Sequence, residues 1–236
     1  MSLRSDVEAL FARQVKELVE SPEFVALESG SASRADYDRL LENVFRSHTK
    51  SPHFLAFLFT LAPPAAVANL RHNLLEEMGV EEETGESHPA LLRQVLAEAG
   101  LADRLEPLEE QAQEDLRQVI VDPLLYGTLR DVGLAVLCEV VAFEYMLSRV
   151  SSRLARALEA HRGLSKQGLE WFTHHSEVDI RHAEQGFDNI EAYARYYEFT
   201  AEDANTICEM TMRENIFVKR YFGELALGRG ITRDPS

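Results

Sequence analysis

Apolar residues recur at helical spacing along almost the whole chain. In the first segment they form one helix face, which consists of Val7, Leu10, Phe11, Val15 and Leu18. The same spacing, with Pro and Gly at the segment ends, predicts further helices over residues 36–61 (bent near Ser51–Pro52), 64–78, 88–100, 107–121, 128–161, 166–197 (one helix or a pair) and 201–227. No alternating run of β-branched residues predicts a strand. The pattern predicts an all-α bundle of about seven to nine helices.

The organisation of the chain points to one unit. Its 236 residues are enough to bury a sizeable core, and no stretch has the composition of a linker. We therefore expect a single domain over residues 1–236, in which residues 228–236 form a frayed tail.

The charge balance excludes some partners. The formal net charge is -16, with 40 acidic against 24 basic residues, and the bases form no stripe. Such a surface repels nucleic acids and anionic membranes. The acidity itself is typical of a soluble protein, and a part of it could consist of internal carboxylates that await cations.

The apolar and cysteine content bears on location. The most apolar stretch, residues 54–70, is interrupted by Pro63–Pro64 and is too short on either side to span a bilayer. The N-terminus has no apolar signal region. Cys138 and Cys208 are too few for a disulfide framework, so we expect buried free thiols and a cytoplasmic location.

The strongest chemical signal lies in residues 175–182. At about 100° per residue, Asp179 lies about 40° from His175 on a helix, and His182 lies about 20° to the other side. Two imidazoles and a carboxylate on one stripe suit Fe(II), Mn(II) or Zn(II). The alternative is a polar surface stripe with incidental histidines. Glu177 and Arg181 point elsewhere and are interpreted as solvated or salt-bridged.

A second signal is Glu144, which lies in a strongly apolar helical stretch. A glutamate there is costly unless it is paired or bound to a metal. Glu139 is a second candidate for such a paired or metal-binding glutamate. It lies five residues away on the same helix, so the two side chains point in different directions. The alternative for either residue is a surface position on an amphipathic helix.

A third signal joins Glu77, at the end of one predicted helix, to His88, at the start of the next. A short loop can fold both side chains back onto one point. The alternative for Glu76 and Glu77 is an exposed acidic helix end, and for His88 a capping or surface residue.

The three signals together supply three carboxylates and three histidines. Two divalent cations bring +4 and the carboxylates bring -3, so the centre is nearly neutral, whereas uncompensated charge in a core is expensive. Without cations the carboxylates would repel one another and take up protons. This balance favours two metal ions over one.

The three motifs resemble those of the haem-oxygenase-like di-iron oxidases and oxygenases, which share their fold with thiaminase II and pyrroloquinoline-quinone synthase. The resemblance covers roughly residues 36–191 and is carried by Asn73 to Gly79 with His88, by Phe143–Glu144, and by His175, Asp179 and His182. It implies a haem-oxygenase-like helical fold whose metal ligands are Glu77, His88, Glu144, His175, Asp179 and His182.

The resemblance also implies an activity. Two Fe(II) ions, or a mixed Mn/Fe pair, would activate O2 as co-substrate to oxidise a small amino-acid-like or fatty-acid-like molecule, with an external reductant where one is needed. A homodimer is common in the family. One subgroup, the self-sacrificing aminobenzoate synthases, is also similar, but this chain has Leu154 where that subgroup has a lysine, and Phe24 near the position of its sacrificed tyrosine.

Two other interpretations remain open. A metal-free hydrolase similar to thiaminase II would use Cys138 as its nucleophile, although a core position is the ordinary reading of that residue. A non-enzymatic protein would bind metal without consuming O2. The remaining histidines are interpreted as structural, and of these His161 and His174 are expected to be exposed; the set is His48, His53, His72, His161 and His174.

Overall fold

The computed structural model describes residues 2–80 and 85–214. The predicted frayed tail, residues 228–236, and the end of the helix predicted over 201–227 lie outside the described residues. Within the described part the regular structure is helical throughout, so the predicted all-α bundle is confirmed. None of the described helices is long and apolar enough to cross a membrane. The α-helices are α1 (Leu3–Val19), α2 (Pro22–Ser29), α3 (Arg34–His48), α4 (Ser51–Thr60), α5 (Val67–Glu77), α6 (His88–Glu98), α7 (Leu105–Leu116), α8 (Leu129–Arg162), α9 (Glu170–Tyr196) and α10 (Ala201–Glu214).

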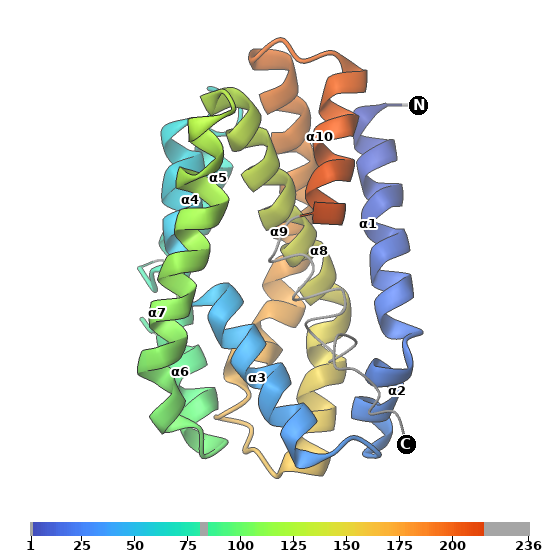
Figure 1. Cartoon of the computed structure of the whole chain (residues 1–236), viewed down its shortest axis with the longest axis vertical. Helices are drawn as coiled ribbons and strands as arrows, with labels where there is room; N and C mark the ends of the chain where they lie inside the picture. Colours follow the sequence, from blue (N-terminus) through green and yellow to red (C-terminus); the bar gives the residue numbers. More distant parts are fainter. Residues whose placement is uncertain (1, 81–84, 215–236) are drawn as a thin grey trace.

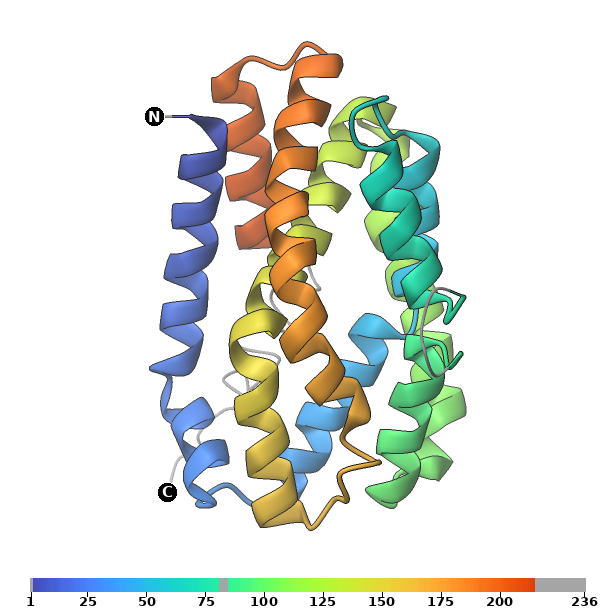
Figure 2. The same cartoon turned by 180° about the vertical axis from the view of Figure 1, so that it is seen from behind.

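Helix α8 forms the axis of the bundle. Its middle part, residues 132–147, is buried on almost every side, which is typical of a helix surrounded by others. Thr128 caps its first turn by accepting a hydrogen bond from the Asp131 amide, and Gly163 ends it in the left-handed region, at a φ of 70°. Helices α8 and α9 run side by side in opposite directions, with α1 and α2 on one side of them and α4 to α7 on the other (Figures 1 and 2).

The predicted helix over residues 36–61 is wrong as a single bent element. The structure contains two helices there, because α3 ends at His48 and α4 begins at Ser51. Pro52 has no amide proton to continue the ladder of α3, but it fits the first turn of a new helix. The short helix α2, which begins with Ser21 as its cap and Pro22 in its first turn, was not predicted.

Close packing between α8 and α9 depends on a glycine. A Cβ added to Gly186 of α9 would lie 2.6 Å and 2.7 Å from the two Cγ atoms of Val141 on α8. Both residues are buried in the core, so neither helix can move away without opening a void. The absence of a side chain at Gly186 therefore sets how near α9 can lie to α8.

We expect Gly186→Ala to lower the free energy of unfolding by about 1–2 kcal/mol in denaturant titrations, because overpacking outweighs the better helix propensity of alanine. The matched control is the same substitution in a Val141→Ala background, which removes both Cγ atoms. There the penalty should shrink or change sign. A stabilising Gly186→Ala in the unmodified chain would contradict the close approach.

Candidate metal centre

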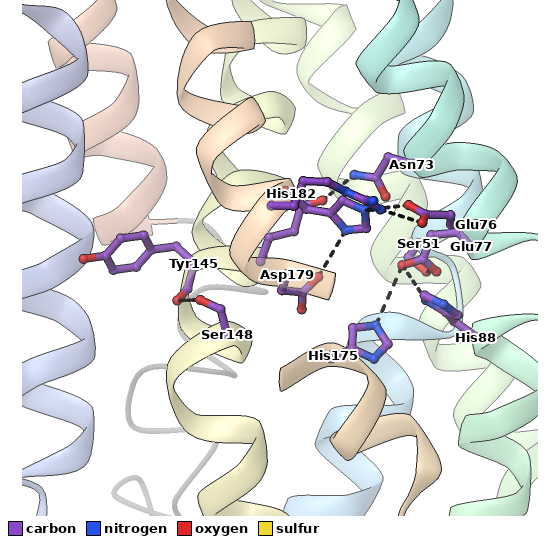
Figure 3. Close-up of polar contacts among 12 residues, drawn as sticks. Ser51, Asn73, Glu76, Glu77, His88, Tyr145, Ser148, His175, Asp179 and His182 are labelled. Atoms are coloured by element: carbon purple, nitrogen blue, oxygen red, sulfur yellow. Dashed lines mark hydrogen bonds and ion pairs between the residues drawn. The ribbon is translucent and has the colours of Figure 1, made fainter. Parts of the chain in front are cut away.

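Four helices direct polar side chains toward one region in the middle of the bundle (Figure 3). Glu77 comes from the last residue of α5, His88 from the first residue of α6 and Glu144 from the middle of α8, and α9 supplies the rest. Apart from Glu77, which is partly buried, each of the predicted ligands is at most 8% exposed. The predicted set is Glu77, His88, Glu144, His175, Asp179 and His182.

The turn after α5 brings Glu77 and His88 together. Gly79 adopts a φ of +74°, and a Cβ there would lie 2.6 Å from the carbonyl carbon of Glu86 and 2.7 Å from the Ser87 amide nitrogen. Two constraints therefore require glycine at position 79: the left-handed backbone conformation and the lack of space for a Cβ. Ser87 caps α6, so His88 stands at the helix start with its Nδ1 3.0 Å from Glu77 Oε1.

Glu77, His88 and His175 form the first cluster, in which one potential ligand atom from each residue lies within 4.8 Å of the others. The backbone carbonyl of Trp171 accepts a hydrogen bond from His175 Nδ1 at 2.7 Å, which leaves Nε2 facing Glu77 Oε1 at 3.9 Å. Ser51 Oγ donates to the other oxygen of Glu77 at 2.5 Å. The side chains are thus held with their metal-binding atoms toward one point.

The electrostatics of Glu77 follow from this arrangement. Burial raises its pKa, but the imidazoles of His88 and His175 beside it lower the pKa more, to well below the usual value. The carboxylate is therefore ionised and ready to bind a cation.

We call Glu144, Asp179 and His182 the second cluster. Their potential ligand atoms do not all lie within 4.8 Å of one another, unlike those of the first cluster. His182 Nδ1 donates to Asp179 Oδ1 at 3.3 Å, and Asn73 Nδ2 donates to Glu144 Oε1 at 2.5 Å. Burial, together with the nearby carboxylates of Asp179 and Glu77, raises the pKa of Glu144 to about 8. Burial alone would lower the pKa of His182, but hydrogen bonds to Asp179 and Glu76 raise it to about 10. In the metal-free protein, protons on Glu144 and His182 therefore provide part of the positive charge that the carboxylates require.

Sequence reasoning missed Glu76. The interpretation of Glu76 as part of an exposed acidic helix end is wrong, because the residue is only 7% exposed. Glu76 Oε2 accepts a hydrogen bond from His182 Nε2 at 2.7 Å, and Oε1 accepts one from Arg181 at 2.6 Å. Asn73, three residues earlier on α5, shares this helix face, and that spacing was the available signal.

A small cavity adjoins both clusters. It measures about 30 Å³, and its lining includes Glu77, Glu144, His175 and Asp179. On this measure a water molecule needs about 10–15 Å³, so the space accepts about two or three molecules of that size. The remaining lining residues are Ser47, His48, Ser51, Phe54, Leu55, Glu139, Val140, Phe143 and Leu147.

Two predictions about residues near this cavity need correction. The alternative of a surface position is wrong for both Glu139 and Glu144, which are 1% and 8% exposed and both line the cavity. His174 was expected to be exposed, but it is partly buried and its ring packs edge-on against His88 with the centroids 4.9 Å apart. His48 is 6% exposed, and burial followed by repulsion from His175 lowers its pKa to about 3, so its imidazole is neutral.

Cys138 lies in the core, as its sequence context predicts. It is fully buried, its Sγ donates to the backbone carbonyl of Cys208 at 3.8 Å, and it is absent from the lining of the cavity. Burial raises the pKa of the thiol well above its usual value. A neutral thiol in this position is a poor nucleophile, which argues against the thiaminase-like alternative.

The six predicted ligands thus provide carboxylate oxygens and imidazole nitrogens in a buried setting, which is a suitable donor set for iron or manganese. Two clusters of three donors share the stripe of α9 that carries His175, Asp179 and His182. The charge of the clusters fits divalent cations, because the carboxylates otherwise require protons.

The pKa of Glu144 leads to a prediction for the metal-free protein. Since the folded-state pKa is raised from 4.5 to about 8, the group contributes its full stability below pH 4.5 and loses it as the pH rises through 8. Glu144→Gln stays neutral and keeps that contribution. In chelator, Glu144→Gln should therefore gain stability relative to the unmodified protein between pH 5 and pH 9, by on the order of a few kcal/mol in urea titrations. A difference that does not change with pH would contradict the raised pKa.

Comparisons with known proteins agree with this donor set. A protein family described as iron-containing redox enzymes matches residues 38–214. A 4-aminobenzoate synthase from Chlamydia pneumoniae is 28% identical over 138 residues, which are 56% of this chain and 58% of that relative. The chain thus matches a little more than half the length of the curated relative.

Proposed function

The chain belongs to the family of iron-containing redox enzymes, and from this membership we propose that it is a non-haem di-iron oxidase or oxygenase that activates O2 to oxidise a small organic molecule. The first cation would bind to Glu77, His88 and His175, and the second to Glu144, Asp179 and His182. The haem-oxygenase-like all-α fold fits this assignment, since such bundles place metal ligands on facing helices.

One observation carries the proposal: the first cluster is already assembled, with its ligand atoms within 4.8 Å, and it lies beside the second cluster on the same stripe of α9. A structural zinc site would satisfy one ion with four protein ligands. Here each ion would receive three, which leaves positions open for O2 and substrate.

The bound irons would supply the reducing electrons and the open coordination positions that O2 activation requires. The protein's own residues hold that centre in place. Ser51 and Asn73 donate hydrogen bonds to Glu77 and Glu144, and the Trp171 carbonyl orients His175. Phe54, Phe143 and Leu147 border the cavity and limit the entry of water.

The cavity also bears on the substrate. About 30 Å³ is room for O2 but not for an organic molecule, so side chains must move when substrate binds. The part of the lining that is not in the clusters is mostly apolar, with neutral polar groups at Ser47 and His48. We propose a compact amino-acid-like or fatty-acid-like substrate whose apolar part contacts this lining.

The activity named for the chlamydial relative is not the one we propose. The resemblance assigns a lysine and a tyrosine to the self-sacrificing aminobenzoate synthases, and this chain has the buried apolar residues Leu154 and Phe24 in those places. Neither side chain can donate an amino group or a phenol. An external substrate is therefore required. A homodimer, a cytoplasmic location, an external reductant and the choice between Fe/Fe and Mn/Fe stay predictions.

Anaerobic Fe(II) titration followed by rapid mixing with O2 tests the proposal. The unmodified protein should bind about two irons per chain and give a transient visible absorbance on mixing. His182→Ala should retain about one iron and lose the transient, because the second cluster loses an imidazole. His53→Ala, which removes an exposed histidine on α4, is the matched control and should behave like the unmodified protein.

Binding of fewer than two irons by the unmodified protein, or a transient that survives His182→Ala, would contradict the di-iron assignment. Stoichiometric binding without any O2 consumption in the presence of a reductant would instead favour a non-enzymatic metal-binding protein.

A further inference from the structure

Helices α5 and α9 are joined at the second cluster by three side chains. Glu76 Oε2 accepts a hydrogen bond from His182 Nε2 at 2.7 Å (Figure 3). Glu76 Oε1 accepts one from Arg181 Nη2 at 2.6 Å. Glu76 is buried, whereas the Arg181 side chain is 48% exposed, so the arginine reaches inward from the surface. His72, one turn earlier on α5, lies 3.4 Å from the same Oε1.

Because of this contact, the two ring nitrogens of His182 face different carboxylates. Nδ1 faces Asp179 of the second cluster at 3.3 Å, and Nε2 faces Glu76. An imidazole that ligates a cation through one nitrogen usually donates its other N–H to a carboxylate or carbonyl, and that partner fixes the tautomer and the ring orientation. Glu76 is in the right place to be that partner.

Arg181 decides between two roles for Glu76. If Glu76 were itself a ligand, its carboxylate would have to bind a divalent cation while it holds a guanidinium at 2.6 Å, and the two positive charges would repel. The guanidinium also orients the carboxylate toward Nε2, because Oε1 is taken and Oε2 is left for the imidazole.

We propose that Glu76 and Arg181 form a positioning pair that holds His182 with Nδ1 toward the second cation and Nε2 protonated. The inference rests on the proposed function, since it concerns how one of the two cations is held. His175 would bind the first cation through Nε2, because its Nδ1 donates a hydrogen bond to the Trp171 carbonyl. Two histidines of one helix stripe thus present opposite ring nitrogens to neighbouring cations.

Glu76 also links the two clusters. It is adjacent to Glu77 on α5, so the last turn of that helix holds the first cation through Glu77 and orients the ligand of the second through Glu76. Loss of the contact between Glu76 and His182 should lower the affinity for the second cation selectively. Losses of about 10–100-fold in affinity are usual when such a partner is removed.

The first test uses the unmodified protein loaded with Zn(II), a diamagnetic substitute, and labelled with ¹⁵N at histidine. Long-range ¹H–¹⁵N correlation spectra should show metal on Nδ1 and a proton on Nε2 of His182, and metal on Nε2 of His175. Metal on His182 Nε2, or a His182 ring without metal, would overturn the proposal.

The second test is Glu76→Gln in an anaerobic Fe(II) titration. An amide can accept a hydrogen bond from only one of the two donors, because its other end is itself a donor. The affinity of the second iron should fall about 10–100-fold while that of the first stays unchanged. Arg181→Gln should give a smaller loss at the same site.

The matched control is Glu184→Gln, which makes the same chemical change on α9 at an exposed ion pair with Arg4. It should leave both affinities unchanged. The positioning pair would be refuted if Glu76→Gln bound the second iron as tightly as the unmodified protein does. It would also be refuted if the substitution lowered the affinity for both irons equally. Failure of the unmodified protein to bind a second cation would refute the proposed function as well, so the two failures are distinguishable.

Discussion

The burial of carboxyl groups in the middle of a helical bundle is the dominant constraint on this structure. The carboxyl groups of Glu77, Glu144 and Asp179 lie in a region from which water is largely removed, and an isolated carboxylate there is strongly unfavourable. The surroundings raise the pKa of Glu144 and of His182, so that Glu144 retains a proton and His182 gains one. Divalent cations would replace those protons, so cation binding and proton release are coupled.

The bundle is arranged to make that burial possible. The long helix α8 supplies a rigid apolar axis, and α9 lies close against it because Gly186 has no side chain. On the other side of α9, Gly79 lets the chain reverse after α5 so that Glu77 and His88 meet. The first cluster therefore combines α9 with α5 and α6, whereas the second cluster lies on the central pair α8 and α9. Glu76 and Asn73 of α5 connect to the second cluster through hydrogen bonds to His182 and Glu144.

Sequence periodicity predicted most of the helices and the stripe on α9, because both depend on local spacing, but it missed the short helix α2. The spacing of His175, Asp179 and His182 places them on one face whatever the tertiary structure is. Glu144 was recognisable because an acid in an apolar helix requires a partner. Glu76 could not be recognised in this way, since its partner is 106 positions away and the choice between Glu76 and Glu77 depends on how α5 faces α9. The shared cavity at Glu139 and Glu144 likewise depends on packing around α8. The break between α3 and α4 was available from Pro52 but was underestimated as a bend.

The number and positions of the bound irons can be measured in a crystal structure of the protein grown anaerobically with Fe(II), with anomalous scattering used to locate the metal. We expect two iron peaks per chain, separated by about 3.5–4 Å. One peak should contact Glu77, His88 and His175, and the other should contact Glu144, Asp179 and Nδ1 of His182. A single peak, or iron bound to Glu76 in place of the second cluster, would contradict the proposed di-iron centre.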